Sequence, residues 1–350
     1  MATLTETAFK TRKIVKFGVV GILAFFVLRL GIGIGGAIWK KINPPPPSPP
    51  TVSFGKIPKI EFPSKDKPNN LTFKLETGSG QLPSLPDKMN VYFMPYQRPN
   101  LLALEKAKQE ALKMGFAGEP EAVDEQTYRW TKKQEATKTL EMNIVNGSFT
   151  ISYDWQNDPT ILLEKKLPGE QQAKVDAQNF LRTLGALNDD LLMGKQEVSY
   201  LKAKANQFVS AISLSEADFV KVEIFRKNVD NWPVLTEDPT RGVISFIFSG
   251  STNQDKKIIK VNFNYFPINY TSSGTYPLQV SDTYWQQLNK KEAFIANWNG
   301  QTDSIIIRRI YLAYFDSFDP QNFFQPIVVF EGDNNFFAYL PAISPEWFQQ

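Results

Sequence analysis

Ser199 and Lys202 have the spacing of an S-x-x-K motif, in which a lysine activates a serine hydroxyl for attack on a carbonyl group. Enzymes of the penicillin-binding class combine this motif with S-D-N and K-T-G. No K-T-G follows here, and Ser281 is followed by Asp-Thr. The sequence around Ser199 also has the pattern of a strand, in which residues three apart point to opposite faces. We therefore assign no catalytic serine.

Carboxylates are the next candidates, because two of them suffice for a glycosidase and several can bind Ca²⁺. Four lie in expected loops near the C-terminus: Asp316, Asp319, Glu331 and Asp333. Acidic residues in turns are more often solvated or bonded to their own backbone, and no EF-hand spacing is present. The sequence therefore predicts neither a catalytic pair nor a metal site here.

Cysteine and histidine are absent from the 350 residues. Their absence removes disulfides, thiolate metal sites and cysteine nucleophiles, together with the usual general base at neutral pH. No cofactor motif replaces them. We predict a protein that is not an enzyme, with no catalytic residue, cofactor or metal.

The positive charge of the chain is confined to its N-terminal part. Seven of the 39 Lys and Arg residues, and one of the 36 Asp and Glu residues, precede residue 42. Subtraction leaves 32 basic and 35 acidic residues beyond that point, a net charge of −3. This balance argues against a nucleic-acid partner.

Residues 17–39 form an apolar run that is long enough, as a helix, to cross a hydrocarbon core of about 30 Å. Basic residues flank it, in a leader at residues 1–16 and again at Lys40 and Lys41. The pattern predicts a single-pass plasma-membrane protein with a cytoplasmic N-terminus and an extracytoplasmic C-terminal domain. A cleaved signal peptide, ending near residues 33–37, is the alternative.

Within this run, Arg29, Gly31 and Gly35 are candidates for contacts in the membrane. A charged residue near the centre of a span is costly, so Arg29 either pairs with an acidic group of another helix or snorkels to the interface. Gly31-x-x-x-Gly35 offers a small-residue face for helix packing. The expected partners are the lipid bilayer, an envelope protein and a second copy of the same helix.

The rest of the chain is expected to be α+β, made of tandem modules in which a helix precedes an antiparallel meander. A Pro-rich spacer at residues 40–50 comes first, since six of the eight residues from Asn43 to Pro50 are proline. An extended lead-in with short strands follows at 51–99. Three modules are predicted at 100–160, 168–270 and 280–343. Their helices are expected at 101–114, 169–184 and 281–297, by apolar periodicity and stops such as Gly115 and Gly185.

The third module carries a resemblance to a known family. Its strands are expected at 305–315, 326–330 and 336–340. The stretches 306–314, 325–332 and 337–341 give the order of a long strand, a strand led by proline, a Gly turn and a strand ending in proline. This order is similar to the PepSY-like modules of the YycH/YycI family. The resemblance implies a membrane-anchored extracytoplasmic domain that regulates a cell-wall sensor kinase. It carries over no functional residue, and the Pro-rich spacer departs from the family pattern.

Aromatic residues make up 13% of the chain and gather toward its C-terminal end. In a strand, adjacent residues point to opposite faces, so one member of each adjacent pair is expected to face outward. The candidate interaction surface consists of Phe323, Phe324, Phe336, Phe337 and Trp298. We therefore expect a non-enzymatic envelope protein acting through protein contacts. The alternatives are a cell-wall glycan-binding or anchoring module and, less favoured, a carboxylate-dependent wall hydrolase.

Overall fold

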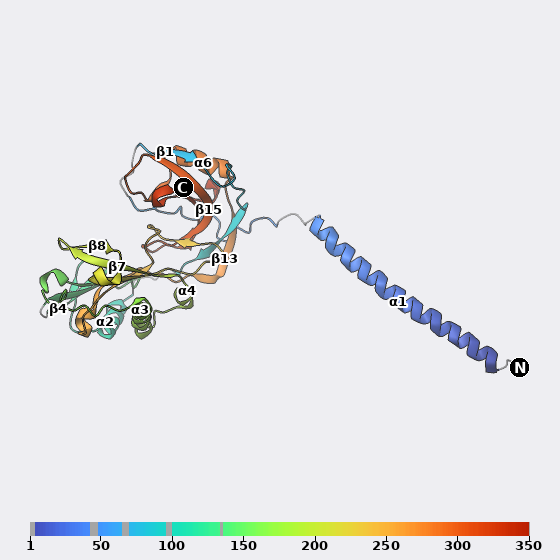
Figure 1. The fold of residues 1–350 in the computed structure, drawn as a ribbon, viewed down its shortest axis with the longest axis horizontal. Coiled ribbons are helices and arrows are strands. Elements are labelled where there is room, and N and C mark those ends of the chain that lie inside the picture. The colour runs from blue at the N-terminus through green and yellow to red at the C-terminus, as the bar shows by residue number, and fades with distance from the viewer. Residues whose placement is uncertain (1–3, 43–47, 65–69, 96–99, 134–135, 350) are drawn as a thin grey trace. The chain divides into compact units, whose positions relative to one another are not determined.

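The computed structural model describes residues 4–42, 48–64, 70–95, 100–133 and 136–349 (Figure 1). The chain divides into two compact units, Met1–Pro49 and Pro50–Gln350, and each is described by itself. Together they give the mixed α+β composition expected, with an apolar helix followed by a body made mostly of β-sheet. The proline-rich residues 43–47 of the predicted spacer lie outside the described residues.

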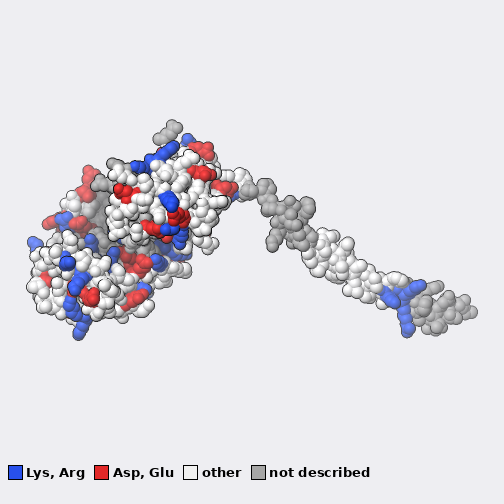
Figure 2. Space-filling view, turned by 45° about the horizontal axis from the view of Figure 1, so that its top comes forward, with Lys and Arg blue, Asp and Glu red and all other residues white. Residues whose placement is uncertain are grey.

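The first unit contains one long helix, α1 (Leu4–Ile42). Its stretch Val15–Ile34 has a mean hydropathy of 2.3 and is long and apolar enough to cross a membrane. Figure 2 shows Lys and Arg side chains gathered near its amino end, where Arg12, Lys13 and Lys16 lie. The predicted apolar helix is confirmed. Signal sequences share this length and composition.

In the second unit, the largest sheet joins nine strands of the described chain in the order β3-β4-β5-β6-β12-β11-β9-β7-β8, all antiparallel. Helices α2 (Ala103–Lys113) and α3 (Glu170–Leu184) lie along one face (Figure 1). The strands are β3 (Glu121–Ala122), β4 (Thr127–Lys133), β5 (Thr137–Asn143), β6 (Phe149–Tyr153), β7 (Gln196–Lys204), β8 (Gln207–Ala211), β9 (Phe219–Ile224), β11 (Ile244–Ser249) and β12 (Ile258–Phe263).

The covering helices fit closely because small residues face the sheet. Ala173, Ala177 and Leu181 of α3 are fully buried and recur at helical spacing. The helix ends at Gly185, whose φ of 69° is left-handed, as glycine permits and as the sequence predicts.

A second sheet lies in the C-terminal half and has the order β1-β15-β17-β18-β14, with β10 also pairing with β15. Helix α6 (Ser281–Asn289) contacts β1. A smaller sheet has the order β13-β2-β16. Their strands are β1 (Thr72–Leu75), β2 (Lys88–Phe93), β10 (Val234–Leu235), β13 (Asn269–Pro277), β14 (Phe294–Asn297), β15 (Ser304–Phe315), β16 (Phe323–Phe324), β17 (Pro326–Gly332) and β18 (Phe336–Pro341).

Short helices complete the described chain. They are α4 (Asp189–Leu192), α5 (Gln254–Lys257) and the 3₁₀ turns Trp155–Asn157, Leu214–Glu216, Asp333–Asn335 and Pro345–Trp347.

The strands of the first two predicted modules share one sheet, because β6 pairs with β12 along the register from Ser152↔Lys260 to Phe149↔Phe263. The division into three modules stays a prediction. The third predicted helix is wrong at its end, since α6 stops at Asn289 and residues 294–297 form β14 instead. Lys291 takes a left-handed φ of 64°, and the following residues alternate in burial as they pair with β18.

A buried ion cluster around Arg226, which follows β9, joins the two large sheets. The Arg226 Nε donates to Asp316 at 2.8 Å, one terminal nitrogen donates to Asp190, and the other donates to the Phe266 carbonyl at 2.7 Å. The guanidinium also lies over the Tyr265 ring at 4.5 Å. Burial raises the pKa of Asp316, and the positive charge of Arg226 offsets part of that increase.

Replacing Arg226 by methionine is expected to destabilise the protein by about 3–5 kcal/mol, because two buried carboxylates lose their cation. Urea unfolding of the full chain in detergent, followed by tryptophan fluorescence, measures the change. Arg308→Met is the matched control, since Arg308 pairs with Glu76 and Asp333 at the surface, where such pairs contribute about 0–1 kcal/mol. Equal losses in the two variants would contradict the role assigned to burial.

Lys138 on β5 is half-buried, and burial lowers its pKa to about 8. A free lysine titrates near 10.4, so between about pH 8 and pH 10 the unfolded chain binds more protons and stability rises with pH. Lys138→Met is expected to remove that rise. Urea unfolding at several pH values in this range measures the slope of stability against pH. Lys133→Met, at an exposed lysine, is the control. An unchanged slope in Lys138→Met would refute the assignment.

Candidate binding pocket

Residues 51–62, which open the second unit, are docked along the C-terminal half of the chain and are called here the docked segment. The Ile57 amide donates to the Trp347 carbonyl, and the Gln349 amide donates to the Ile57 carbonyl, both at 2.9 Å. Tyr276 adds a hydroxyl hydrogen bond to the Gly55 carbonyl at 2.9 Å. The segment is thus fixed by backbone hydrogen bonds although only an isolated bridge, Ile57↔Phe348, is β-structure.

Side chains at the far end of the docked segment enter the core. The Phe62 ring stacks on Phe294 and meets Phe315 edge-on, with centroids 5.0 Å apart in each case. Ile60 is buried in the same apolar cluster. From the opposite side, Gln325 donates its side-chain nitrogen to the Pro58 carbonyl at 2.9 Å. The segment is therefore held between β14, β15 and the chain entering β17.

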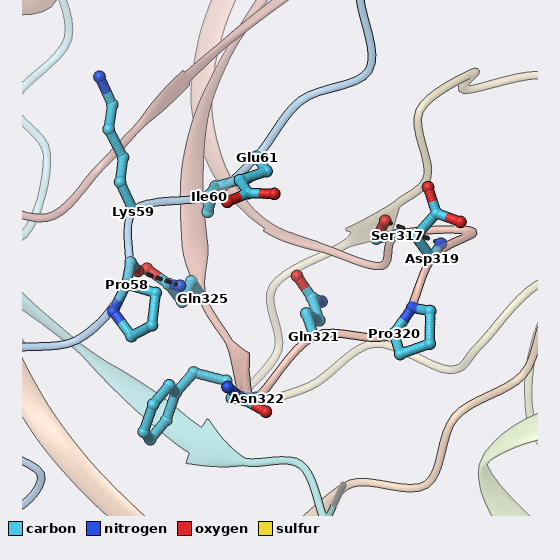
Figure 3. Close-up of a pocket in the computed structure, with 11 residues that line it drawn as sticks. Pro58, Lys59, Ile60, Glu61, Ser317, Asp319, Pro320, Gln321, Asn322 and Gln325 are labelled. Atoms are coloured by element: carbon cyan, nitrogen blue, oxygen red, sulfur yellow. Dashed lines mark hydrogen bonds between the residues drawn. The ribbon is translucent and has the colours of Figure 1, made fainter. Parts of the chain in front are cut away.

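A cavity of about 310 Å³ lies between the docked segment and the loop that joins β15 to β17 (Figure 3). We call it the candidate pocket. It is lined by Pro58, Lys59, Ile60, Glu61, Ser317, Asp319, Pro320, Gln321, Asn322, Phe323 and Gln325.

Hydrogen bonds within the loop hold its shape. Ser317 donates its hydroxyl to Glu237 at 3.1 Å and accepts the Asp319 amide at 3.0 Å. The Gln321 side-chain nitrogen donates to the Phe315 carbonyl at 2.9 Å. The Asn322 carbonyl accepts the Met94 amide at 2.9 Å, which attaches the loop to the end of β2. The pocket wall is thus preformed.

Only one of the aromatic residues predicted as an interaction surface lines the candidate pocket. Phe323 is half-buried, and its ring packs against Phe54 at 5.1 Å and Phe93 at 6.1 Å. Phe324 and Phe336 are almost fully buried and belong to the core. Phe337 is half-buried against a neighbouring apolar cluster. In each adjacent pair, one ring is therefore buried and the other is only partly exposed.

The other predicted residues lie elsewhere. Trp298 is half-buried against the core, with its indole nitrogen donating to the Thr302 carbonyl at 3.1 Å. On α1, Arg29 is exposed, and a Cβ added at Gly31 would meet no atom within 4 Å beyond its chain neighbours and the helix backbone. Gly35 is helical, but its surroundings lie outside the described residues. Trp298 does not line the candidate pocket.

The four loop carboxylates are separated in the structure. Asp316 is buried against Arg226, while Glu331 pairs with Arg309 at 2.8 Å and Asp333 with Arg308 at 2.7 Å. Asp319 alone lines the candidate pocket. Among the residues that the structure describes, no group of three acidic side chains is placed to hold a metal ion.

Glu61 and Gln325 are pocket residues that the sequence did not reveal. They are more than 250 positions apart, and no local pattern links them. The Pro-punctuated loop around Pro320 was the only available signal, because loops of this kind often carry function.

No family model matches this chain, and no curated protein is similar to it. An uncharacterized protein from Eubacterium rectale is 10% identical, with a TM-score of 0.35, over 74% of this chain and 84% of that one. The C-terminal domain of YpeB from Bacillus megaterium is 10% identical, with a TM-score of 0.29, over 73% of this chain and 96% of that one. Scores this low support no functional conclusion, and the likeness to YycH/YycI modules stays a prediction.

Gln325→Met is expected to loosen the docked segment, since the Pro58 carbonyl loses its side-chain donor while the volume is nearly kept. Hydrogen–deuterium exchange should become faster at the Ile57 and Gln349 amides. The amides of β17 and β18 serve as the internal reference and are expected to exchange as in the wild type. Unchanged protection at Ile57 would show that the backbone bonds alone hold the segment.

Proposed function

We propose that this protein is a single-pass, membrane-anchored binding protein of the cell envelope that acts through contacts with another protein and performs no catalysis. The apolar stretch Val15–Ile34 supports anchoring, and the basic residues before it favour a cytoplasmic N-terminus. The second unit would then lie outside the membrane. Charges of both signs alternate over the face of it that Figure 2 shows, which is typical of a solvated surface.

The candidate pocket is the observation that carries the proposal. It is preformed, and one wall belongs to the docked segment, which is the part of the second unit nearest in sequence to α1. A partner in the pocket would contact residues that begin nine positions after Pro49, at Pro58. Binding there would thus act on the chain that leads to the helix. Kinase regulation, implied by the family resemblance, would be one use of such an arrangement.

No catalytic arrangement competes with this proposal among the described residues. Ser199 and Lys202 are both exposed on β7, without a K-T-G or S-D-N motif in the sequence. Of the four loop carboxylates, Asp316, Glu331 and Asp333 are paired with arginines. Asp319 and Glu61 both line the candidate pocket, but both are exposed, whereas the general acid of a glycosidase lies in an apolar pocket that keeps it protonated.

A photo-reactive amino acid at Asn322, which is exposed at the pocket, is expected to cross-link one discrete partner in intact cells. The same group at Glu125, exposed in the turn between β3 and β4, is the control and should not capture it. A photo-reactive group at Pro320, which is also exposed at the pocket, should give the same adduct, and adding Asn322→Trp should abolish it by filling the pocket.

Two outcomes would contradict the proposal. Identical adducts from Asn322 and Glu125 would indicate non-specific contact. An adduct that persists in Asn322→Trp would place recognition outside the pocket.

A further inference from the structure

Three side chains around the candidate pocket donate hydrogen bonds to the protein itself. The Ser317 hydroxyl donates to Glu237, the Gln321 amide nitrogen to the Phe315 carbonyl and the Gln325 amide nitrogen to the Pro58 carbonyl. Each of these Gln side chains keeps one further N–H donor and a carbonyl oxygen that accepts. The two amide oxygens therefore contribute acceptors to the pocket wall.

Two carboxylates add to this acceptor surface. Glu61 and Asp319 are exposed, line the cavity, and have no side-chain partner among the described residues. Figure 3 shows both around the same space as Gln321. Among the described residues, Lys59 is the only cation in the lining, and it extends away from that space (Figure 3). The interior of the pocket is thus negative.

One acceptor in the pocket wall is buried and unpaired. Gln325 is only 4% exposed, and its side-chain oxygen has no hydrogen-bond partner among the described residues. An unpaired buried acceptor costs about 1–3 kcal/mol, so most such groups in folded proteins are paired. A donor that enters the cavity and reaches this oxygen through a small shift of the wall would recover that cost.

We propose that the candidate pocket binds a cationic nitrogen, an ammonium or guanidinium group, presented by a Lys or Arg side chain of the partner protein. Such groups carry several donors and no acceptor, which complements a pocket with acceptors left over. Pro58, Pro320 and Phe323 supply apolar walls for the aliphatic stem. The volume of about 310 Å³ suits one side chain and its backbone. This inference rests on the proposed function.

The test uses the full chain in detergent and four probes: acetyl-Gly-Lys-Gly-amide, acetyl-Gly-Arg-Gly-amide, acetyl-Gly-Gln-Gly-amide and n-butylamine. Chemical-shift changes in selectively labelled glutamine side chains, Gln325 and Gln321 among them, report binding. Both cationic peptides are expected to bind at least 10-fold more tightly than the glutamine peptide. They should also bind more tightly than n-butylamine, which has the cation and stem without a peptide backbone.

Charge-neutral variants provide the second arm. The double variant Glu61→Gln, Asp319→Asn keeps the shape of the pocket and is expected to weaken the binding of the cationic peptides at least 10-fold. Glu346→Gln, an exposed carboxylate away from the pocket lining, is the matched control and should leave binding unchanged. Raising the salt concentration should weaken binding in the wild type more than in the double variant.

Equal binding of the glutamine and lysine peptides, or no effect of the double variant, would overturn the cation assignment. The same holds if no probe binds. Binding of n-butylamine as tight as that of the peptides would overturn a polypeptide source. Cross-linking from Asn322 is independent of these results. Capture of a discrete partner there would support the proposed function even if the peptide experiments contradict a cationic ligand.

Discussion

The guanidinium of Arg226 is enclosed by protein, and its hydrogen bonds run to three segments that are far apart in the sequence. Asp190 belongs to α4, Phe266 follows β12 and Asp316 follows β15. An ion pair removed from water is stable only when its remaining hydrogen bonds are satisfied, so all three segments must be in place at once. This requirement couples the nine-stranded sheet to the sheet that contains β15.

A second polar cluster extends that coupling. Asp230 accepts hydrogen bonds from the hydroxyls of Tyr92, at 2.7 Å and 2.8 Å, and Tyr314, at 3.0 Å. Tyr270 lies beside Tyr92 and donates to Asp190, which links the two clusters. The loop that starts at Asp316 is therefore anchored at its root by a buried charge, and the candidate pocket is built on a fixed base.

The docked segment gives the pocket its other wall. A proline-rich linker acts as an extended, semi-rigid spacer. Here Phe62 is packed between two aromatic rings, and the Pro58 and Ile57 carbonyls accept hydrogen bonds from the C-terminal half. Occupation of the pocket and the position of this segment are thus physically connected.

The sequence by itself determined the properties that depend on local pattern and composition. The apolar run predicted α1, the absence of Cys and His limited the chemistry, and helical periodicity with Gly185 located α3. Most strands of the antiparallel meanders also followed from alternation. Only the tertiary structure decided which strands pair, as in the parallel contact of β1 with β15, and which carboxylate is buried, as with Asp316. The pocket belongs to this second group, because Glu61 and Gln325 meet through long-range packing that local periodicity does not encode.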